Sequence, residues 1–393
     1  MAAPIPSSSR PLRVTLQSHS LPKYRNPVWE ELARRPGMDL TIVYGNAPDG
    51  PPSVAPTGFR ARCVPQRRLQ LPGRTVLWHA PQWEEATRAN ADVIVFNWNL
   101  NYASLVPGLL RARANGLGTV LWGHGYSANE AVWRELPRRA VSELAHALLF
   151  YAEPAAAEYR ARTAAPERIF VAANALDQRE IQAARDPWLV APERLAAFRR
   201  EQGIDSGPVL LFVARLDVGK RVDLLLRAAA QLRGELPGLR VLIVGSGAEE
   251  RSSRELAESL GLGSAVHFLG AIYDEKDLAP FFLSSDLFVM PSAVGLSILH
   301  AFGYGLPVVT HAERRRHGPE IAALRDGENG LLFGPPGDLN ALVGTLRTTL
   351  SNPDRIRTMA RAAHRTATEE FTVARMNDGT EQAIHFAAAA ARR

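Results

Sequence analysis

Cysteine and long apolar runs are what this sequence lacks most clearly. Its 393 residues include one cysteine, Cys63, which excludes an internal disulfide and favours a reducing compartment. No stretch of roughly eighteen apolar residues occurs, so no membrane-spanning helix is expected. The opening "MAAPIPSSSRPLRV" lacks the apolar core of a secretion signal. We therefore expect a cytoplasmic protein.

Several ligand-binding motifs are also missing. There is no Asp-x-Asp pair to chelate a divalent metal and no zinc-ligand spacing. No Gly-x-Gly-x-x-Gly follows the first strand expected in either half, which disfavours a dinucleotide-dependent dehydrogenase. No nucleic-acid recognition module is visible. The sequence therefore predicts no metal site and no bound cofactor, and it gives no support to a nucleic-acid partner.

Positive charge, most of it from arginine, is what the sequence has in excess. The formal net charge is +6, and arginines cluster at 67–74, 111–113, 137–139 and 313–318. Such a balance favours anionic partners such as phosphates, nucleotides or acidic lipid headgroups. A solvated, arginine-rich surface is the simpler alternative for most of these clusters.

Short apolar runs alternate with helix-length segments along most of the chain, which is the pattern of parallel βαβ units. The length exceeds what one hydrophobic core usually supports, so two domains are expected. The Pro- and Gly-rich stretch 46–75 indicates loops with one short strand at most. Strands are expected at 12–18, 39–45, 91–97, 118–124, 147–152 and 168–174, and again at 208–215, 240–247, 266–271, 287–292, 306–311 and 329–334.

These elements predict an α/β fold made of two doubly wound, Rossmann-like domains. We expect an N-terminal domain at 1–180, a polar helical connector at 181–206, a C-terminal domain at 207–370, and a final helix at 371–393 that packs back on the N-terminal domain. In open parallel sheets, ligands bind at the carboxyl ends of the strands. A cleft between two facing domains is therefore the expected active site.

A cationic site is indicated at the start of the second half. Arg215 follows the strand at 208–215, and Lys220 lies five residues further on, at the start of the next helix. Two cations beside a helix N-terminus form a suitable diphosphate site, although two surface charges are an equal alternative. Gly245 and Gly247, in "VGSGAEE", permit close backbone approach at the next strand end.

Taken together, the motifs of the second half resemble a known family. "VARLDVGKRVDLLLRA", "VLIVGSGAE", "VHFLGAI", "SSDLFVMPS", "GLSILHAFGYGLPVV" and "ENGLLFGPPGD" occur in the order found in retaining glycosyltransferases of family four, which have the GT-B fold and use nucleotide-sugar donors. The resemblance covers roughly 207 to 350. The first domain resembles the acceptor-side half more loosely, through "VLWGHGYS", "FYAEPAAAEYRAR" and "IFVAANALD".

The resemblance implies roles for individual residues. Arg215 and Lys220 would grip the donor diphosphate and stabilise charge on the leaving nucleotide. Gly270 and Ala271, within 269–274, would line the base. Gly295 and Leu296 would offer helix N-terminal amides to the donor. Glu320, in "GPEI", would face the cleft, with a surface or capping role as the alternative.

The chain also departs from the family pattern. The family often places two glutamates eight positions apart, where they contact the donor sugar and the ribose. The matching positions here are Ser292 and His300, and neither is acidic. The imidazole of His300 can hydrogen-bond ribose hydroxyls and Ser292 a sugar hydroxyl, whereas a satisfied core histidine is the plain alternative. A different donor sugar or lost activity would also explain the departure.

In the first domain, His124 ends a strand between two glycines, where members of the family have a histidine close to the reacting centre and the acceptor. The resemblance implies a catalytic role in which His124 positions the acceptor hydroxyl or helps to stabilise the donor phosphate. A loop histidine bonded to a carbonyl is the alternative. The family's glycine-rich loop after the first strand is absent, and polar and basic side chains stand there instead: His19, Lys23, Tyr24 and Arg25. Asn97 and Asn99, after another strand, are expected either to bind hydroxyls or to form turns.

The sequence thus predicts a metal-independent glycosyltransferase that acts on a glycan or lipid-linked acceptor in polysaccharide or glycolipid biosynthesis. Basic patches near Leu109, Leu110 and Trp133 suggest peripheral attachment to an anionic membrane face. Two alternatives remain open. One is a sugar-nucleotide epimerase or hydrolase of the same fold, and the other is a non-catalytic nucleotide-sugar-binding subunit.

Overall fold

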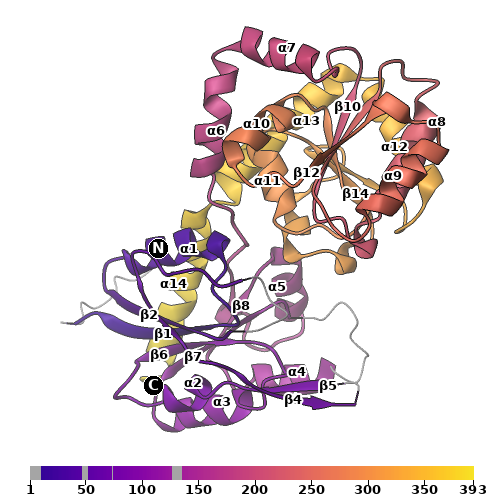
Figure 1. The fold of residues 1–393 in the computed structure, drawn as a ribbon. Coiled ribbons are helices and arrows are strands. Elements are labelled where there is room, and N and C mark those ends of the chain that lie inside the picture. The colour runs from indigo at the N-terminus through magenta and orange to yellow at the C-terminus, as the bar shows by residue number, and fades with distance from the viewer. Residues whose placement is uncertain (1–9, 47–51, 73, 126–134) are drawn as a thin grey trace. The chain divides into compact units, whose positions relative to one another are not determined.

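The structure, a computed structural model, describes residues 10–46, 52–72, 74–125 and 135–393. The chain forms two compact units, one from residues 1–174 with 373–393 and the other from residues 175–372. Each unit has a parallel β-sheet between layers of helices (Figure 1), so the predicted α/β class with two doubly wound domains is confirmed. Within the described ranges, no helix is long and apolar enough to cross a bilayer.

The main sheet of the first unit has the strand order β3-β2-β1-β6-β7-β8-β9, and all neighbouring strands are parallel. The order reverses between β1 and β6, which is where an open α/β sheet offers a crevice at its carboxyl edge. Its strands are β1 (Leu12–Ser18), β2 (Met38–Tyr44), β3 (Arg60–Cys63), β6 (Val93–Asn97), β7 (Gly118–Gly123), β8 (Ala147–Phe150) and β9 (Ile169–Val171). Its helices are η1 (Lys23–Arg25), α1 (Asn26–Ala33), α2 (Pro81–Glu84), α3 (Leu105–Ala114), α4 (Glu135–Ser142), α5 (Glu153–Arg160), η3 (Pro166–Arg168) and α14 (Val373–Ala390).

A small hairpin accompanies this sheet. β4 (Arg67–Leu71) pairs antiparallel with β5 (Arg74–Trp78), and every residue of β4 is exposed. The stretch 46–75 therefore holds, in its described part, both β3 and most of a hairpin, where one short strand was expected. The strand signal was weak because arginines occupy the strand positions and no core buries the alternate side chains.

The C-terminal segment belongs to the first unit. Helix α14 packs on α1, β7, β8 and β9, as Figure 1 also shows. Asn377 Nδ2 donates to the Val28 carbonyl over 2.8 Å, and Gly379 lies so close to the Val171 carbonyl that no side chain fits there. The small residues of α14 thus let its backbone approach the sheet closely, which ties this segment to elements from the first half of the chain.

The sheet of the second unit has the strand order β12-β11-β10-β13-β14-β15, again all parallel. This is the doubly wound order 3-2-1-4-5-6, with its switch point between β10 and β13. The strands are β10 (Val209–Val213), β11 (Arg240–Val244), β12 (Val266–Gly270), β13 (Leu287–Val289), β14 (Val308–His311) and β15 (Gly330–Phe333). The helices are α6 (Arg179–Leu189), α7 (Pro192–Glu201), η4 (Val218–Lys220), α8 (Val222–Leu232), α9 (Glu250–Ser259), η5 (Gly263–Ala265), α10 (Glu275–Leu283), α11 (Ser297–Gly303), η6 (Arg314–Arg316), η7 (Pro319–Ala323), α12 (Leu339–Leu350), α13 (Pro353–Arg365) and η8 (Thr366–Glu370).

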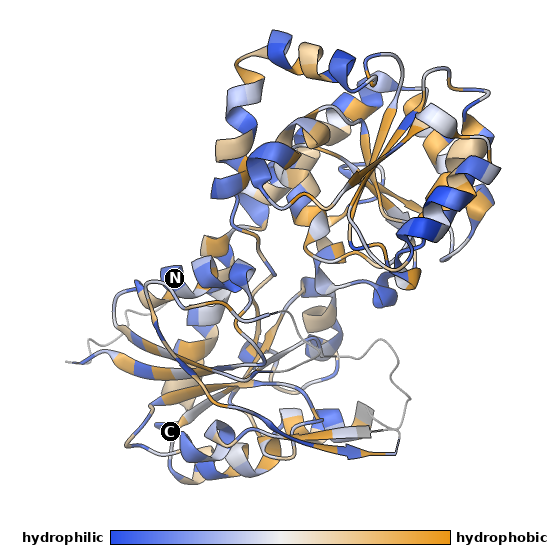
Figure 2. Ribbon diagram, in the orientation of Figure 1, coloured by the Kyte–Doolittle hydropathy of each residue, from blue (hydrophilic) through white to orange (hydrophobic). Residues whose placement is uncertain are grey.

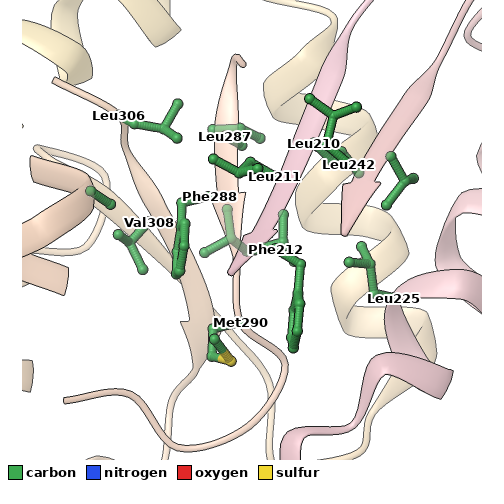
Figure 3. Close-up of a cluster of buried hydrophobic side chains, with 14 of the residues drawn as sticks. Leu210, Leu211, Phe212, Leu225, Leu242, Leu287, Phe288, Met290, Leu306 and Val308 are labelled. Carbon is green, nitrogen blue, oxygen red and sulfur yellow. The ribbon is translucent and has the colours of Figure 1, made fainter. Parts of the chain in front are cut away.

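The core of the second unit explains why its strands read as continuous apolar runs. Residues on both faces of β10 and β13 are buried, because helices cover both faces of a parallel sheet. Figure 3 shows Phe212 of β10 and Phe288 of β13 among leucines from neighbouring elements. Figure 2 shows the same pattern for the whole unit, with hydrophobic strands inside and hydrophilic residues on the outer faces of the helices. This packing fixes the strand ends that carry the candidate site.

Residues 181–206, expected as a connector, are mostly helical. They contain most of α6 and all of α7, and both helices pack on α10 within the second unit. The polar composition that suggested a linker reflects the exposed faces of these two helices, since no residue of α7 is fully buried.

Candidate functional site

The loop after β10 carries the cations expected to bind a diphosphate. Arg215 is exposed, and its Nε lies 2.7 Å from Asp217 Oδ2. Lys220 ends η4 and is half-buried. Both residues therefore stand on one loop at the carboxyl end of β10, next to the switch point of the sheet. A bound diphosphate would compete with Asp217 for the Arg215 guanidinium.

The residue after Lys220 adopts an unusual backbone conformation. Arg221 has φ 55°, and no other described residue apart from glycines has a positive φ. Its guanidinium holds Asp223 through two hydrogen bonds of 2.9 and 3.1 Å. A left-handed conformation costs an ordinary residue about 1–3 kcal/mol and is often kept at functional sites. Here it sets the turn that joins Lys220 to α8.

A cavity of about 350 Å³ opens beside this loop, between η4, the start of α8 and α9. Its lining includes Arg221 but also three carboxylates, those of Asp217, Asp223 and Glu249. Arg215 and Lys220 do not line it. The balance of charge does not favour an anion, so this cavity is not the expected diphosphate site.

Close packing explains why glycine occupies both positions, Gly245 and Gly247, after β11. Gly245 lies so close to the Ala214 carbonyl, and Gly247 so close to the Leu216 carbonyl, that neither position has room for a Cβ. The Leu216 N–H also donates to the Ser246 carbonyl over 2.9 Å. These contacts hold the β11–α9 loop against the β10–α8 loop. They account for both glycines without a ligand and fix the backbone on either side of Arg215.

The segment expected to line a base follows β12. Gly270 has φ 72°, and its carbonyl accepts a 2.7 Å hydrogen bond from the Gly245 N–H. Ala271 is exposed, and two residues on Tyr273 has 93% of its surface accessible. The segment thus presents an open backbone and an exposed aromatic ring at the same sheet edge as Arg215, because β12, β11 and β10 are parallel neighbours.

His300 has a partner that sequence spacing did not reveal. Its Nε2 lies 2.7 Å from Glu275 Oε1, at the start of α10, and Tyr304 donates its hydroxyl to the same oxygen over 2.6 Å. The His300 ring packs on Phe282 at 4.8 Å between centroids. Burial first, and then Glu275, raises the pKa of Tyr304, which keeps that hydroxyl a donor. His300 is half-buried, so it is neither a plain core histidine nor an isolated ligand.

The loop before α11 brings together Ser292, Gly295 and Glu320. Ser292 is 7% exposed, and its Oγ is enclosed without a hydrogen-bond partner in the described part of the chain. Glu320 is 5% exposed, so it is not a surface residue. Its Oε2 lies 3.7 Å from the point where a Cβ on Gly295 would be, and it also fills the space beside Gly318. A buried carboxylate therefore stands next to Gly295 and the beginning of α11, where Leu296 is the N-cap.

His317 braces that loop, which the sequence did not predict. Its Nδ1 accepts from the Val294 N–H over 3.1 Å, and its Nε2 donates to the His311 carbonyl over 3.0 Å. The two histidine rings stack at 4.0 Å. Burial, followed by the charges of His311 and Arg314, lowers the pKa of His317 to about 4. His317 is thus a neutral structural residue, although it lies in a segment that reads as a surface charge cluster.

In the first unit, His124 follows β7 as expected. A Cβ on Gly123 would lie 2.8 Å from Trp98 Cβ, and Gly125 has φ 75°, so both flanking glycines are required by the local backbone and packing. The His124 ring lies 4.9 Å from the Tyr151 ring. His124 is exposed, yet desolvation of its ring first, and then the cations Arg25 and Arg138, lower its pKa, which favours the neutral imidazole.

The polar side chains of the loop after β1 differ in burial and in partners. His19 Nδ1 lies 2.5 Å from the Tyr102 hydroxyl, and that hydroxyl accepts from Gln66 Nε2 over 2.8 Å. Arg25 is instead buried, with the ring of Tyr24 5.5 Å from its guanidinium. Lys23 opens the short helix η1 and is exposed.

The two asparagines at the end of β6, Asn97 and Asn99, differ in their surroundings. Asn99 Oδ1 accepts from the Asn101 N–H over 2.9 Å, which is the turn-forming role given as its alternative. Asn97 is the last residue of β6 and is half-buried.

The strand order makes the second unit a doubly wound α/β domain, and the comparisons define it further. Residues 196–366 match the model of a family described as "Glycosyl transferases group 1". This part of the chain, which makes up most of the second unit, is similar to glycosyl transferases group 1. The resemblance of these motifs to glycosyltransferases is thereby confirmed.

Curated relatives align with about half of the chain. A D-inositol 3-phosphate glycosyltransferase of Rhodococcus erythropolis is 34% identical over 201 residues, which are 48% of this chain and 44% of that protein. The lipopolysaccharide core biosynthesis glycosyltransferase LpsE of Rhizobium meliloti is 29% identical over 182 residues, 46% of this chain and 50% of that protein. The chain thus spans about half the length of the curated relatives it matches.

Solved structures resemble nearly the whole chain. HepE of Anabaena, crystallised in complex with UDP, superimposes with a TM-score of 0.67 at 18% identity, covering 95% of this chain and 99% of that chain. Sucrose-phosphate synthase of Thermosynechococcus elongatus gives 0.63 at 19% identity, covering 96% and 100%. At such identities the likeness establishes the fold, which is the GT-B glycosyltransferase fold, as predicted.

Proposed function

We propose that this protein is a metal-independent glycosyltransferase. It transfers a sugar, with retention of configuration, from a nucleotide diphosphate sugar to a glycan or lipid-linked acceptor in polysaccharide or glycolipid biosynthesis in the cytoplasm. One observation carries the proposal: within a domain similar to glycosyl transferases group 1, the Arg215–Lys220 loop stands at the carboxyl end of β10, and the Gly295 loop follows the neighbouring strand β13. Ligands of doubly wound sheets bind at such a switch point.

The proposed chemistry follows from the charges. When the bond between the anomeric carbon and the phosphate oxygen breaks, negative charge builds on the departing nucleoside diphosphate, and the carbon becomes oxocarbenium-like. Fixed cations that face the departing group lower the barrier, because they stabilise charge that develops only as the bond breaks. Arg215 and Lys220 take this role in the proposal, so no metal ion is required.

Ser292 and Glu320 are proposed to hold the donor sugar. The Ser292 Oγ has no hydrogen-bond partner among the described residues and is enclosed, so it would bond a sugar hydroxyl after its side chain rotates toward the loop. The buried carboxylate of Glu320 stands beside Gly295 and offers a charged acceptor to a second hydroxyl. Together they would replace the acidic residue that relatives place at the position of Ser292.

His300 and Glu275 are proposed to bind the ribose, and 269–274 to line the base. His300 already donates toward Glu275, which leaves its other ring nitrogen to accept from a ribose hydroxyl. In the first unit, His124 is proposed to orient the acceptor hydroxyl, because a neutral imidazole at a strand end can accept a hydrogen bond from it.

Nucleotide binding is the direct test of this assignment. A panel of UDP-, GDP- and ADP-sugars is screened for thermal stabilisation, since a ligand that binds only the folded state raises the melting temperature. The best nucleotide is then titrated calorimetrically into the Arg215→Ala, Lys220→Ala double variant, with Arg251→Ala as the control, because Arg251 is an exposed arginine of α9 paired with Glu255. We expect a loss of affinity of about tenfold or more in the double variant only. Equal affinity in all three proteins would refute the diphosphate site.

The two alternative functions are separated by incubating the protein with donor alone and following it by NMR. An epimerase changes the sugar and a hydrolase releases it without any acceptor, whereas a binding subunit leaves the donor intact even when acceptor extracts are added. A glycosyltransferase consumes the donor at an appreciable rate only with an acceptor.

We also propose peripheral attachment to an anionic membrane face. The attachment surface differs from the one that the sequence suggested. Leu109 is buried in the core and Trp133 lies outside the described residues, whereas Leu110 is 50% exposed. The hairpin β4–β5 offers a better surface, because Leu69 and Leu71 are 59% and 42% exposed on a strand that begins with two arginines. Apolar side chains beside cations suit the boundary between headgroups and acyl chains.

A further inference from the structure

The guanidinium of Arg25 is buried in the first unit without a carboxylate partner among the described residues. Arg25 is 9% exposed, and its side chain donates to Asn174 Oδ1 over 2.7 Å and to Met376 Sδ over 3.6 Å. Both of these acceptors are neutral. A buried cation normally needs an anionic partner, because desolvation is not repaid by neutral groups alone.

Aromatic rings supply part of the compensation. The rings of Tyr24, Trp29, Trp122 and Tyr151 lie with their centroids 5.5 to 5.8 Å from the Arg25 guanidinium carbon. Such contacts hold the cation in a fixed orientation, since the ring faces attract positive charge. They do not saturate its hydrogen bonds: a guanidinium has five N–H groups, and neutral rings and one amide leave most of them without a strong acceptor.

The donors that remain are not sealed off. Nε of Arg25 has no hydrogen-bond partner among the described residues, yet it is not one of the fully enclosed polar atoms of the structure. Nε therefore keeps a small area accessible to solvent, where an acceptor group can reach it. An oxyanion fits best, because it accepts two parallel N–H bonds from one guanidinium and neutralises its charge.

The place of this cluster in the fold is that of a ligand site. Arg25 follows β1, Tyr151 follows β8, Asn174 follows β9, and Trp122 lies at the end of β7. All of these strands are parallel, so the groups gather at the carboxyl edge of one sheet. His124 stands at the same edge, with its ring 4.9 Å from the Tyr151 ring that also faces Arg25.

The local charge is positive. Arg25 and the buried Arg138 both act on His124 and favour its neutral form. A neutral imidazole can donate one hydrogen bond to an oxyanion through its N–H. A negative group here would meet the Arg25 guanidinium and a ring donor, with Arg138 adding positive charge at His124. The rings already hold the guanidinium, so binding requires little rearrangement.

We infer that Arg25 and His124 form an oxyanion-recognition site in the first unit, which holds a phosphate or carboxylate group carried by the acceptor. This inference rests on the proposed function, in which the first unit binds the acceptor. It narrows the acceptor from any glycan or lipid-linked sugar to one with a negative charge close to the hydroxyl that is glycosylated. A purely structural Arg25, one that only ties α14 to the sheet through Met376, would bind no anion.

The first experiment titrates the intact protein with glucose 1-phosphate, glucuronate and glucose, and follows the His124 ring by NMR. We expect saturable shifts with one or both anions and none with neutral glucose. The anion that saturates at the lower concentration identifies the group as phosphate or carboxylate. Shifts that do not saturate with either anion would overturn the inference without any variant being made.

The second experiment compares arginine variants. Arg25→Met is expected to weaken anion binding about ten- to a hundredfold, because it removes charge-assisted hydrogen bonds. Arg25→Lys keeps the positive charge and serves as the second variant in case Arg25→Met does not fold. We expect Arg25→Lys to bind the anion several-fold more weakly than the native protein does. Arg168→Met is the matched control, since Arg168 is also buried but bonds the Ser142 and Ala145 carbonyls. Undiminished binding in folded Arg25→Lys and Arg25→Met would disprove the site.

The third experiment separates this site from the donor site. The anion titration is repeated with a saturating amount of the nucleoside diphosphate that stabilises the protein most. The inference requires the His124 response to survive, and its loss would mean that Arg25 serves the donor diphosphate instead. If no nucleotide stabilises the protein, the proposed function fails, while the first titration still decides whether Arg25 binds an oxyanion.

Discussion

Glu275 Oε1 lies 2.7 Å from His300 Nε2, so a carboxylate from the start of α10 stands where α11 carries no acid of its own. Tyr304 donates to the same oxygen and fixes the carboxylate from a second side. Helices α10 and α11 thus contribute Glu275 and His300, which are 25 residues apart in the sequence, to one polar cluster at the surface of the second unit. His300, one of the two departures from the family pattern, is therefore held by a carboxylate from another helix.

The first prediction concerns this cluster. Glu275→Gln removes the charge that orders His300, so we expect the affinity for the nucleoside diphosphate to fall about tenfold. The affinity for the 2′,3′-dideoxy nucleotide should change little, because the lost interaction is with the ribose hydroxyls. Calorimetry on both nucleotides measures the difference.

Glu250→Gln serves as the matched control for Glu275→Gln, since Glu250 is also at the start of a helix and pairs with Arg254 on α9. Equal losses for the normal and the dideoxy nucleotide would argue against a ribose contact and for a general change of the domain.

The second prediction is a pH dependence that originates at His317. Its pKa is lowered to about 4 in the folded protein, by burial first, whereas an unfolded histidine titrates near 6.5. Between these values the unfolded chain binds the additional proton, so stability falls as the pH decreases from about 6.5 to about 4. The full effect is about 3 kcal/mol at most.

Denaturant unfolding of the second unit at pH 7.5, 6 and 5 measures how its free energy of unfolding changes with pH. His317→Gln should be less stable at pH 7.5, because it loses hydrogen bonds to Val294 and His311, but its stability should fall less on acidification. Burial, as the largest cause, also lowers the pKa of His267 and His364 in the same unit, and their contribution remains in both proteins. An unchanged pH slope in His317→Gln would contradict the assignment.

The third prediction separates glycines needed for packing from those that face a ligand. Gly247→Ala places a Cβ against the Leu216 carbonyl, which cannot move without displacing the Arg215 loop, so we expect a loss of about 1–3 kcal/mol in stability. Gly219, between Val218 and Lys220, has no positive φ, and no atom lies within 4 Å of the position that a Cβ would take there. Gly219→Ala should therefore keep the stability.

Nucleotide affinity completes this comparison. If the diphosphate approaches the backbone beside Lys220, Gly219→Ala will weaken nucleotide binding several-fold at unchanged stability. Gly234→Ala is the control, since its Cβ also meets nothing and it lies away from the candidate site, after α8. Native affinity in Gly219→Ala would place the diphosphate elsewhere on the loop.

The sequence predicted the parts of the fold that follow from local patterns. Buried strands such as β10 can be predicted from their apolar runs, because a strand covered on both faces excludes polar residues. The contact of Glu275 with His300 has no such signal, since it depends on how α10 and α11 pack. His317 was hidden for a similar reason: its neighbours Arg314, Arg315 and Arg316 give the segment the composition of an exposed charge cluster, while the histidine itself is buried.

Arg25 shows that prediction of the candidate site from sequence is limited in the same way. Sequence placed it correctly in the loop after β1, among basic and polar residues, but could not distinguish it from the exposed Lys23 two positions earlier. Its burial results from rings that come from separate segments of the chain. Chemistry that depends on long-range packing is therefore visible only in the fold.

The last prediction concerns the hairpin β4–β5 and membrane attachment. Leu69 pairs with Val76 and Arg67 with Trp78 across the two strands, so apolar and cationic side chains share one face. Burying two leucines in the acyl boundary and placing arginines among anionic headgroups both favour binding. We expect the native protein to sediment with phosphatidylglycerol-containing vesicles at low salt and to dissociate as salt screens the charges.

Leu69→Ser with Leu71→Ser should reduce the vesicle-bound fraction several-fold without loss of stability, because both side chains are exposed in the folded protein. Leu189→Ser is the matched control, since Leu189 is 47% exposed at the end of α6 in the second unit. Equal sedimentation of the double variant and the native protein would exclude the hairpin as the attachment surface. Absence of binding at low salt in the native protein would exclude attachment to anionic vesicles altogether.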